Sequence, residues 1–141
     1  STSSIANSKC VIIKFQAGSV IEKGRVVTIT DASGVAKIIK ILSTDPDSET
    51  VIGITNESGV LNGDVDVCIG GIFEACVQNG ETINIGQFLE KSGSGFSENQ
   101  GRVTGNNSAS IGTFGIALTS ATGNTAGTVF IKGLYKKNEN F

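Results

Sequence analysis

Apolar and polar residues alternate along most of this chain. In CVIIKFQ (10–16), Val11, Ile13 and Phe15 fall on one face of an extended segment, and Lys14 and Gln16 fall on the other. The same alternation is present in three further segments: DVDVCI (64–69), FGIAL (114–118) and TVFIKG (128–133). A period of two is the signature of half-buried β-strands. The pattern therefore predicts a protein built from short strands.

The segments between these runs have the residues that turns require. They are rich in Gly, Asn, Asp and Ser, and the chain contains 19 glycines and one proline. Such residues accept the positive φ angles of tight turns between strands. The turn segments are DASG, NESG, LNGD, VQNG, KSGSG and GNTAG. The run VAKIIKIL (35–42) is predicted to be a strand because it is rich in β-branched residues. We expect no amphipathic helix.

The sequence also resembles itself at an offset of 62 residues. Residues 11–72 and 73–134 align without a gap, and turns fall on turns and strand faces on strand faces. Twelve positions are identical: Gln16/Gln78, Gly18/Gly80, Ile21/Ile83, Gly24/Gly86, Ser48/Ser110, Gly53/Gly115, Ile54/Ile116, Ser58/Ser120, Asn62/Asn124, Val67/Val129, Ile69/Ile131 and Gly71/Gly133. We interpret this as a duplication of one β unit.

The length of the repeat bears on the domain organisation. A unit of about 62 residues is too small to bury an adequate core alone. We therefore predict one all-β domain, a compact β-barrel or β-sandwich, over residues 10–135, with internal repeats 11–72 and 73–134. Residues 1–9 are predicted to be a flexible N-terminal arm, and residues 136–141 a C-terminal tail.

The alternation also predicts which side chains form the core. The expected core residues are Val11, Ile13, Phe15, Val27, Ile52, Ile54, Val67, Ile69, Phe114, Ile116, Val129 and Ile131. Gly53 and Gly115 are expected at equivalent strand positions, where another backbone comes close or the strand bulges.

Composition and charge exclude several classes of function. Only 17% of the 141 residues are charged, the net charge is −2, and the basic residues are scattered, which argues against a nucleic-acid partner. No apolar run approaches the roughly 20 residues of a membrane span. We therefore expect the protein to bind neither nucleic acid nor a membrane.

The chain has three cysteines, Cys10, Cys68 and Cys76, in no metal-binding or CxxC spacing. Cys68 and Cys76 lie in strand-like runs, so we expect both to be buried free thiols, unbonded to each other, as suits a protein assembled in a reducing cytoplasm.

Candidate catalytic chemistry is sparse. The chain has no histidine, so the usual base for a serine or cysteine nucleophile is missing. The acidic loop DPDSE (45–49) lacks the glycine and the final glutamate of a calcium loop. We therefore predict no enzyme activity, no catalytic residues, no cofactor and no bound metal.

Three stretches together resemble a known group of proteins. They are FQAGSVIEKGRVV (15–27), NGDVDVCIGGIFEA (62–75) and IGTFGIALTSATGNTAGTVFIKG (111–133). Over residues 11–134 the arrangement of glycines and alternating apolar residues resembles the capsid decoration, or cement, proteins of tailed bacteriophages. The resemblance implies a non-enzymatic structural protein of the virion. It would be a homotrimer on the capsid exterior that bridges major capsid protein subunits and so stabilises the head.

Two alternatives stay open. The chain could be a small carbohydrate- or peptide-binding β module of a phage fibre or adhesin, although it has one tyrosine and no tryptophan for stacking on sugars. An enzyme with a carboxylate pair is the other alternative, but no spacing pairs its acidic residues. A trimeric protein without an aromatic-lined cleft would favour the role of a decoration protein over that of a binding module.

The predicted contact residues lie in the N-terminal arm. This segment is small and polar with a single apolar residue, and it leads directly into the first strand, so it could order by adding its backbone to the sheet edge of another chain. We predict that it contacts the capsid or a neighbouring subunit through Ser1, Thr2, Ser3, Ser4, Ile5, Ala6, Asn7 and Ser8.

Overall fold

The computed structural model describes residues 9–46 and 51–137 of the chain. Apart from one 3₁₀ turn, η2 (Ser97–Asn99), the regular structure of these residues is all β. None of their helices is long and apolar enough to cross a membrane. The strands are β1 (Cys10–Gln16), β2 (Val26–Ala32), β3 (Val35–Lys40), β4 (Gly53–Thr55), β5 (Asp64–Cys76), β6 (Thr82–Ile83), β7 (Phe88–Lys91), β8 (Val103–Asn106), β9 (Gly115–Ala117), β10 (Ala121–Thr122) and β11 (Phe130–Tyr135). The all-β prediction is confirmed.

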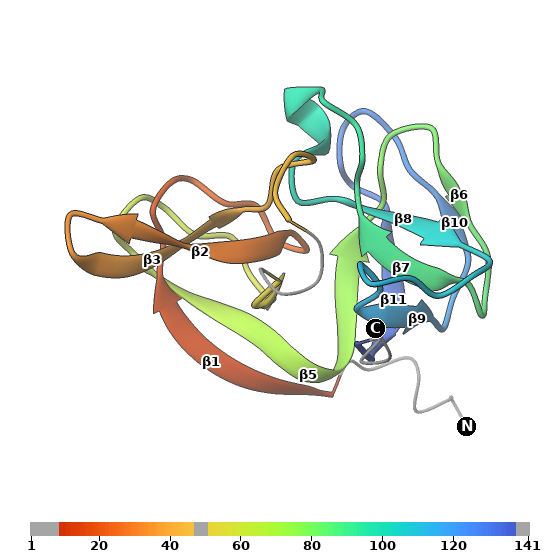
Figure 1. The fold of residues 1–141 in the computed structure, drawn as a ribbon, viewed down its shortest axis with the longest axis horizontal. Coiled ribbons are helices and arrows are strands. Elements are labelled where there is room, and N and C mark those ends of the chain that lie inside the picture. Colours follow the sequence, from red (N-terminus) through yellow and green to blue (C-terminus); the bar gives the residue numbers. More distant parts are fainter. Residues whose placement is uncertain (1–8, 47–50, 138–141) are drawn as a thin grey trace.

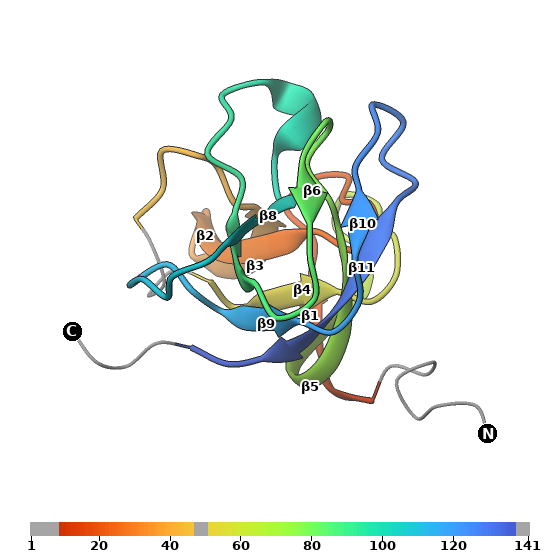
Figure 2. The same ribbon diagram turned by 90° about the vertical axis from the view of Figure 1, so that its right-hand side faces the viewer.

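Nine of these strands form one curled antiparallel sheet. The order is β3-β2-β4-β5-β11-β9-β7-β8, and β1 pairs with β5 outside this path. The short strands β6 and β10 pair separately. Figure 1 shows β1, β2 and β3 at one end of the molecule and β6 to β11 at the other, with β5 running between them. The view turned by 90° shows the sheet curling around the interior (Figure 2).

Strand β5 is the element that joins the two ends. Its first part pairs with β1 and β4, and its last residues, from Ile72 to Cys76, pair with β11. Gly71 lies between the two parts with φ of +84°, and a Cβ there would collide with the carbonyl oxygen of Lys9. The strand can therefore bend beside the start of β1 only because a glycine occupies this position.

The β2–β3 hairpin confirms the turn predicted at DASG. Ser33 and Gly34, the two residues between the strands, have positive φ angles of 56° and 87°. Two such residues are the hallmark of the type I′ turn, whose twist matches that of paired strands. The backbone N–H of Gly34 also donates to the carboxylate of Asp31 at 2.7 Å. The turn fixes the register that continues to Val27 opposite Lys40.

The hydrophobic core draws on both halves of the chain. Its larger cluster combines residues of the first half, such as Val26 and Ile54, with Phe73, Leu89 and Phe114 from the second. The rings of Phe73 and Phe114 pack with centroids 5.9 Å apart. A second, smaller cluster lies within the first half and includes Ile21 and Ile38. The larger cluster therefore joins the two halves, whereas the smaller one belongs to the first half alone.

The predicted core is correct in part. Val27, Ile54, Val67, Phe114 and Ile131 are fully buried. The prediction is wrong for Val11 and Ile13, which are exposed because no other element packs over the middle of β1. Five residues are only partly buried: Phe15, Ile52, Ile69, Ile116 and Val129. The alternation of apolar and polar residues correctly predicted where the strands lie. It did not predict which strands have a face covered by another element.

Strand pairing repeats at the offset seen in the sequence. The pairs of β2 with β4 match those of β7 with β9, and one bridge of the first half matches a β6–β10 pair. The matching pairs are Val26–Ile54 with Phe88–Ile116, and Ile21–Gly59 with Ile83–Ala121. Gly24 and Gly86 both have positive φ angles, of 77° and 88°. The duplication stays a prediction, which a superposition of 11–72 on 73–134 would test.

Gly53 and Gly115 begin β4 and β9, and close contacts explain both glycines. A Cβ on Gly53 would collide with the carbonyl oxygen of Cys68, and one on Gly115 would lie 2.8 Å from the ring of Phe73 and 3.1 Å from the carbonyl oxygen of Leu134. The expectation of close backbone approach at equivalent positions is confirmed. Any larger side chain would push β4 or β9 away from its neighbour.

Candidate interaction surface

Strand β1 carries an unusual run of exposed apolar residues. The consecutive residues Val11, Ile12 and Ile13 are 58%, 38% and 43% exposed. Adjacent residues of a strand point to opposite faces, so both faces of this strand are open to solvent along its middle. Only its two ends reach the core, where Cys10 packs against the larger cluster and Phe15 against the smaller one.

Strand β1 is also an edge strand in the described part of the chain. It pairs with β5 on one side, from Cys10–Gly71 to Gln16–Asp64, and no strand pairs along its other side. Lys14 lies opposite Asp66 and forms an ion pair with it at 2.8 Å. This pair is exposed, so it orients the strand more than it stabilises it. An open edge with apolar side chains can accept another strand.

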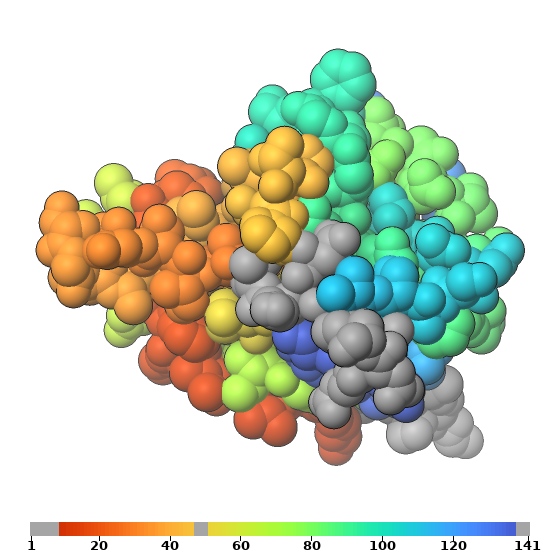
Figure 3. Space-filling view, in the orientation of Figure 1, coloured from red at the N-terminus to blue at the C-terminus, as the bar shows by residue number. Residues whose placement is uncertain are grey.

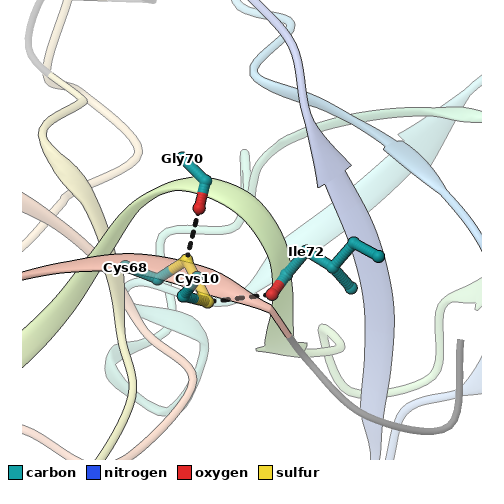
Figure 4. The surroundings of a disulfide bond; sticks show 4 residues. All are labelled: Cys10, Cys68, Gly70 and Ile72. Carbon is teal, nitrogen blue, oxygen red and sulfur yellow. Dashed lines mark hydrogen bonds between the residues drawn. A yellow bond between two sulfur atoms is a disulfide. The ribbon is translucent and has the colours of Figure 1, made fainter. Parts of the chain in front are cut away.

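A disulfide bond between Cys10 and Cys68 fastens the start of β1 to β5 (Figure 4). The expectation that Cys68 is a free thiol was therefore wrong. The two cysteines are 58 residues apart in sequence, but antiparallel pairing of β1 with β5 brings their Cα atoms to 5.4 Å, within the range that a disulfide spans. The bond compensates for the few core contacts that β1 makes.

The disulfide sits where β5 bends. The Sγ atom of Cys10 lies 2.8 Å from the carbonyl oxygen of Ile72, and that of Cys68 lies 3.1 Å from the carbonyl oxygen of Gly70 (Figure 4). Cys76 is buried and free, so the predicted lack of a bond between Cys68 and Cys76 is confirmed. Burial raises the pKa of the Cys76 thiol, although the nearby Arg25 and Arg102 act in the opposite direction.

Exposed apolar side chains concentrate in the first half of the chain. Of the 13 large hydrophobic residues that are exposed in the described part, nine lie between residues 11 and 61. These nine are Val11, Ile12, Ile13, Val20, Ile29, Val35, Leu42, Val60 and Leu61. Figure 3 shows the β2–β3 hairpin, in orange, projecting from this end of the molecule. Clusters of exposed apolar residues, unlike single ones, mark interaction surfaces.

We define the β1 surface as Val11, Ile12 and Ile13, the exposed apolar residues along the open edge of β1. The residues predicted from the sequence to make contact, Ser1 to Ser8, lie outside the described residues. The arm leads into β1, however, and it is β1 that carries the exposed apolar run. Sequence analysis assigned Val11 and Ile13 to the core instead. A strand with one buried face alternates apolar and polar residues, whereas residues 11–13 are all apolar. This uninterrupted triplet was the signal that β1 does not have one buried and one exposed face.

Comparison with known proteins identifies the fold. No protein-family model matches the chain, and no curated protein does. Among solved structures, the N base of the head fibre gp8.5 of bacteriophage phi29 is similar, with a TM-score of 0.62 and 14% sequence identity. The match covers 94% of this chain and 100% of that structure. The chain therefore has the fold of this domain over nearly its whole length.

Proposed function

We propose that this protein is a structural component of a bacteriophage virion that attaches to the outer surface of the head. The observation that carries the proposal is the match to a head-fibre base domain, over 94% of this chain and the whole of that structure. The resemblance of residues 11–134 to decoration proteins points to the same location by a separate route. The proposal assigns the chain no chemical reaction.

Within this proposal, two roles are compatible with the fold. The domain is either the capsid-bound base of a fibre or a cement protein that bridges major capsid protein subunits. Both roles need a rigid core and a binding surface rather than reactive side chains. In either role we expect a homotrimer, because several identical sites held together multiply weak binding to a symmetric capsid.

The β1 surface is the proposed capsid contact. It combines an open sheet edge with exposed valine and isoleucine, and the N-terminal arm precedes it in the chain. An arm or strand of the capsid could pair with the β1 edge while the apolar side chains of β1 pack against it. The Cys10–Cys68 bond would hold β1 in place as this contact forms.

A carbohydrate- or peptide-binding module of a fibre is the second candidate. The fibre context of the similar domain favours it. Among the described residues, however, Phe96 is the one exposed aromatic side chain. The cavity of about 420 Å³ has a single aromatic ring in its wall, that of Phe130, and a smaller cavity beside the β2–β3 hairpin has none. Stacking on a sugar would need an exposed aromatic platform.

The proposal is tested by mixing purified protein with capsids assembled from the major capsid protein encoded in the same genome, then pelleting the capsids. Wild-type protein is expected to co-sediment at a fixed ratio. Val11→Asp/Ile13→Asp should weaken binding at least ten-fold, because it places charges in an apolar contact. Ile85→Asp, at an equally exposed site beyond β6 at the other end of the fold, is the matched control and should bind normally. Absence of binding by the wild type would contradict the proposal.

The same mixture separates the two roles. A cement protein should raise the temperature at which the capsids disassemble, whereas a fibre base should bind without changing that temperature. Light scattering with size-exclusion chromatography measures the oligomeric state, and a monomer at micromolar concentration would contradict the proposed trimer.

A further inference from the structure

The chain contains only two arginines, Arg25 and Arg102, and both are buried in the same place. Their exposed fractions are 5% and 3%. Arg25 directly precedes β2 and Arg102 directly precedes β8, yet both line one cavity of about 420 Å³. Arginine is rarely buried without a partner of opposite charge, because removing the guanidinium from water is costly.

The protein supplies these guanidinium groups with few anionic partners. Arg102 donates only to two backbone carbonyl oxygens, those of Asn124 at 2.8 Å and Thr125 at 3.1 Å, and pairs with no described carboxylate. Arg25 donates to the carbonyl oxygen of Gln100 at 3.3 Å and lies 3.6 Å from the carboxylate of Glu22. The Nε atoms of both arginines are buried and have no hydrogen-bond partner in the described part of the chain.

Both guanidinium groups approach the same glycine. A Cβ on Gly127 would lie 2.8 Å from Nη2 of Arg102 and 3.0 Å from Nη2 of Arg25. Gly127 has φ of +72°, so its loop reaches the arginines in a conformation that other residues rarely adopt. Two like charges thus lie close together in a poorly solvated site, which is unfavourable unless an anion joins them.

The rest of the cavity wall does not balance this charge. Lys23 and Lys40 add two positive charges, and Glu22 and Glu98 provide two negative ones. Each lysine is already paired, Lys40 with Glu22 at 2.9 Å and Lys23 with Glu74 at 3.2 Å. A protein with a net charge of −2 therefore keeps an excess of positive charge in one of its cavities.

We propose that this cavity binds an oxyanion, the carboxylate, phosphate or sulfate group of a small molecule, between Arg25 and Arg102. Planar guanidinium groups match the oxygen geometry of such anions and bind them with paired hydrogen bonds. Each guanidinium group carries five N–H donors, and the hydrogen bonds among the described residues use one donor of Arg25 and two of Arg102. The cavity lies in the size range of small-molecule sites, so it has room for a ligand body beyond the anionic group. The proposal does not depend on attachment to a phage head.

Because the sequence has only two arginines, nuclear magnetic resonance tests the proposal directly. A ¹⁵N-labelled sample has two arginine Nε–H signals. Phosphate, sulfate and acetate are titrated separately against sodium chloride at constant ionic strength, which keeps charge screening the same. Saturable shifts of both signals with at least one oxyanion, and none with chloride, are expected. Equal shifts with chloride, or no shift with any oxyanion, would overturn the proposal.

The anion that the arginines bind could instead be a carboxylate of a second copy of the protein. Dilution of the free protein distinguishes this source from a small molecule. If the Nε–H signals move with protein concentration and not with added anions, the guanidinium groups pair with a carboxylate of a second copy. That result would also overturn the proposal.

Two variants test the electrostatics without removing an arginine. Glu98→Gln removes a negative charge from the exposed cavity rim and keeps an acceptor for the Asn79 amide that Glu98 binds at 2.9 Å. It should tighten oxyanion binding about two- to five-fold. Asp64→Asn, the same change at the start of β5 and away from the cavity, should leave binding unchanged.

Arg102→Lys is the complementary variant, which should weaken oxyanion binding rather than tighten it. Lysine keeps the charge but cannot form the planar pair of hydrogen bonds, so binding should weaken about ten-fold. Unaltered affinity in both Glu98→Gln and Arg102→Lys would show that the anion binds elsewhere.

Discussion

The disulfide gives the sharpest test of how the first half of the protein is held together. Cys10 and Cys68 close a loop that contains β1 to β4 and the start of β5. In the chain-entropy account, a cross-link over 58 residues restricts the unfolded chain enough to stabilise the fold by about 4 kcal/mol. Because β1 has few core contacts of its own, reduction should loosen this strand first.

The assay is urea unfolding of the oxidised and reduced protein, followed by circular dichroism. Reduction should lower the free energy of unfolding by about 4 kcal/mol and raise the denaturant slope, since the reduced unfolded chain exposes more surface. The control is Cys10→Ala/Cys68→Ala, whose transition a reductant should not move. Alkylation of unfolded, unreduced protein should modify Cys76 alone. Labelling of all three cysteines, or identical oxidised and reduced transitions, would refute the reasoning.

Three further predictions concern packing and acid stability. Gly53→Val should prevent β4 from pairing with β5 and lower the melting temperature by more than 10 °C, because its Cβ would overlap the carbonyl oxygen of the neighbouring strand; an unchanged melting temperature would contradict this. Ile54→Ala, at a fully buried site, should cost about 2–5 kcal/mol in denaturant titration, and Ile116→Ala at the corresponding half-buried site should cost less; equal costs would show that the burial difference is wrong. Burial raises the pKa of Glu22 and Glu74, but the hydrogen bonds and charges of the neighbouring lysines, joined by Arg25 at Glu22, together outweigh burial and lower the pKa of both carboxyls from its ordinary value. The folded state then binds protons less readily than the unfolded chain, so this stabilisation is present above the pKa of an unfolded glutamate and is lost as the pH falls through the lower folded pKa values. Glu74→Gln should lessen the loss of stability in acid, and an identical pH profile would argue against the ion pairs.

The sequence was sufficient to predict the class of fold because local rules govern its strands and turns. Alternation located β1, β5, β9 and β11, and the Asp-Ala-Ser-Gly turn between β2 and β3 forms as expected. Gly53 and Gly115 could be predicted because glycine within a strand usually reports a close neighbour. These features depend on residues near one another in the chain.

The features that the sequence did not predict depend on long-range packing. Val11 and Ile13 alternate like core residues, but their burial depends on whether another element covers β1, which no local pattern records. The Cys10–Cys68 bond depends on the register between β1 and β5, which no local pattern records, and the sequence therefore led to the wrong expectation of a free Cys68. Arg25 and Arg102, 77 positions apart, meet only because their strands belong to the same curled sheet.

The central claim is that this domain attaches to the outside of a phage head. Cryo-electron microscopy of capsids incubated with the wild-type protein tests it most directly. We expect additional density on the capsid exterior, at symmetry-related positions, into which the described fold fits with β1 against the capsid surface. Capsids that remain bare at saturating protein concentration would contradict the claim.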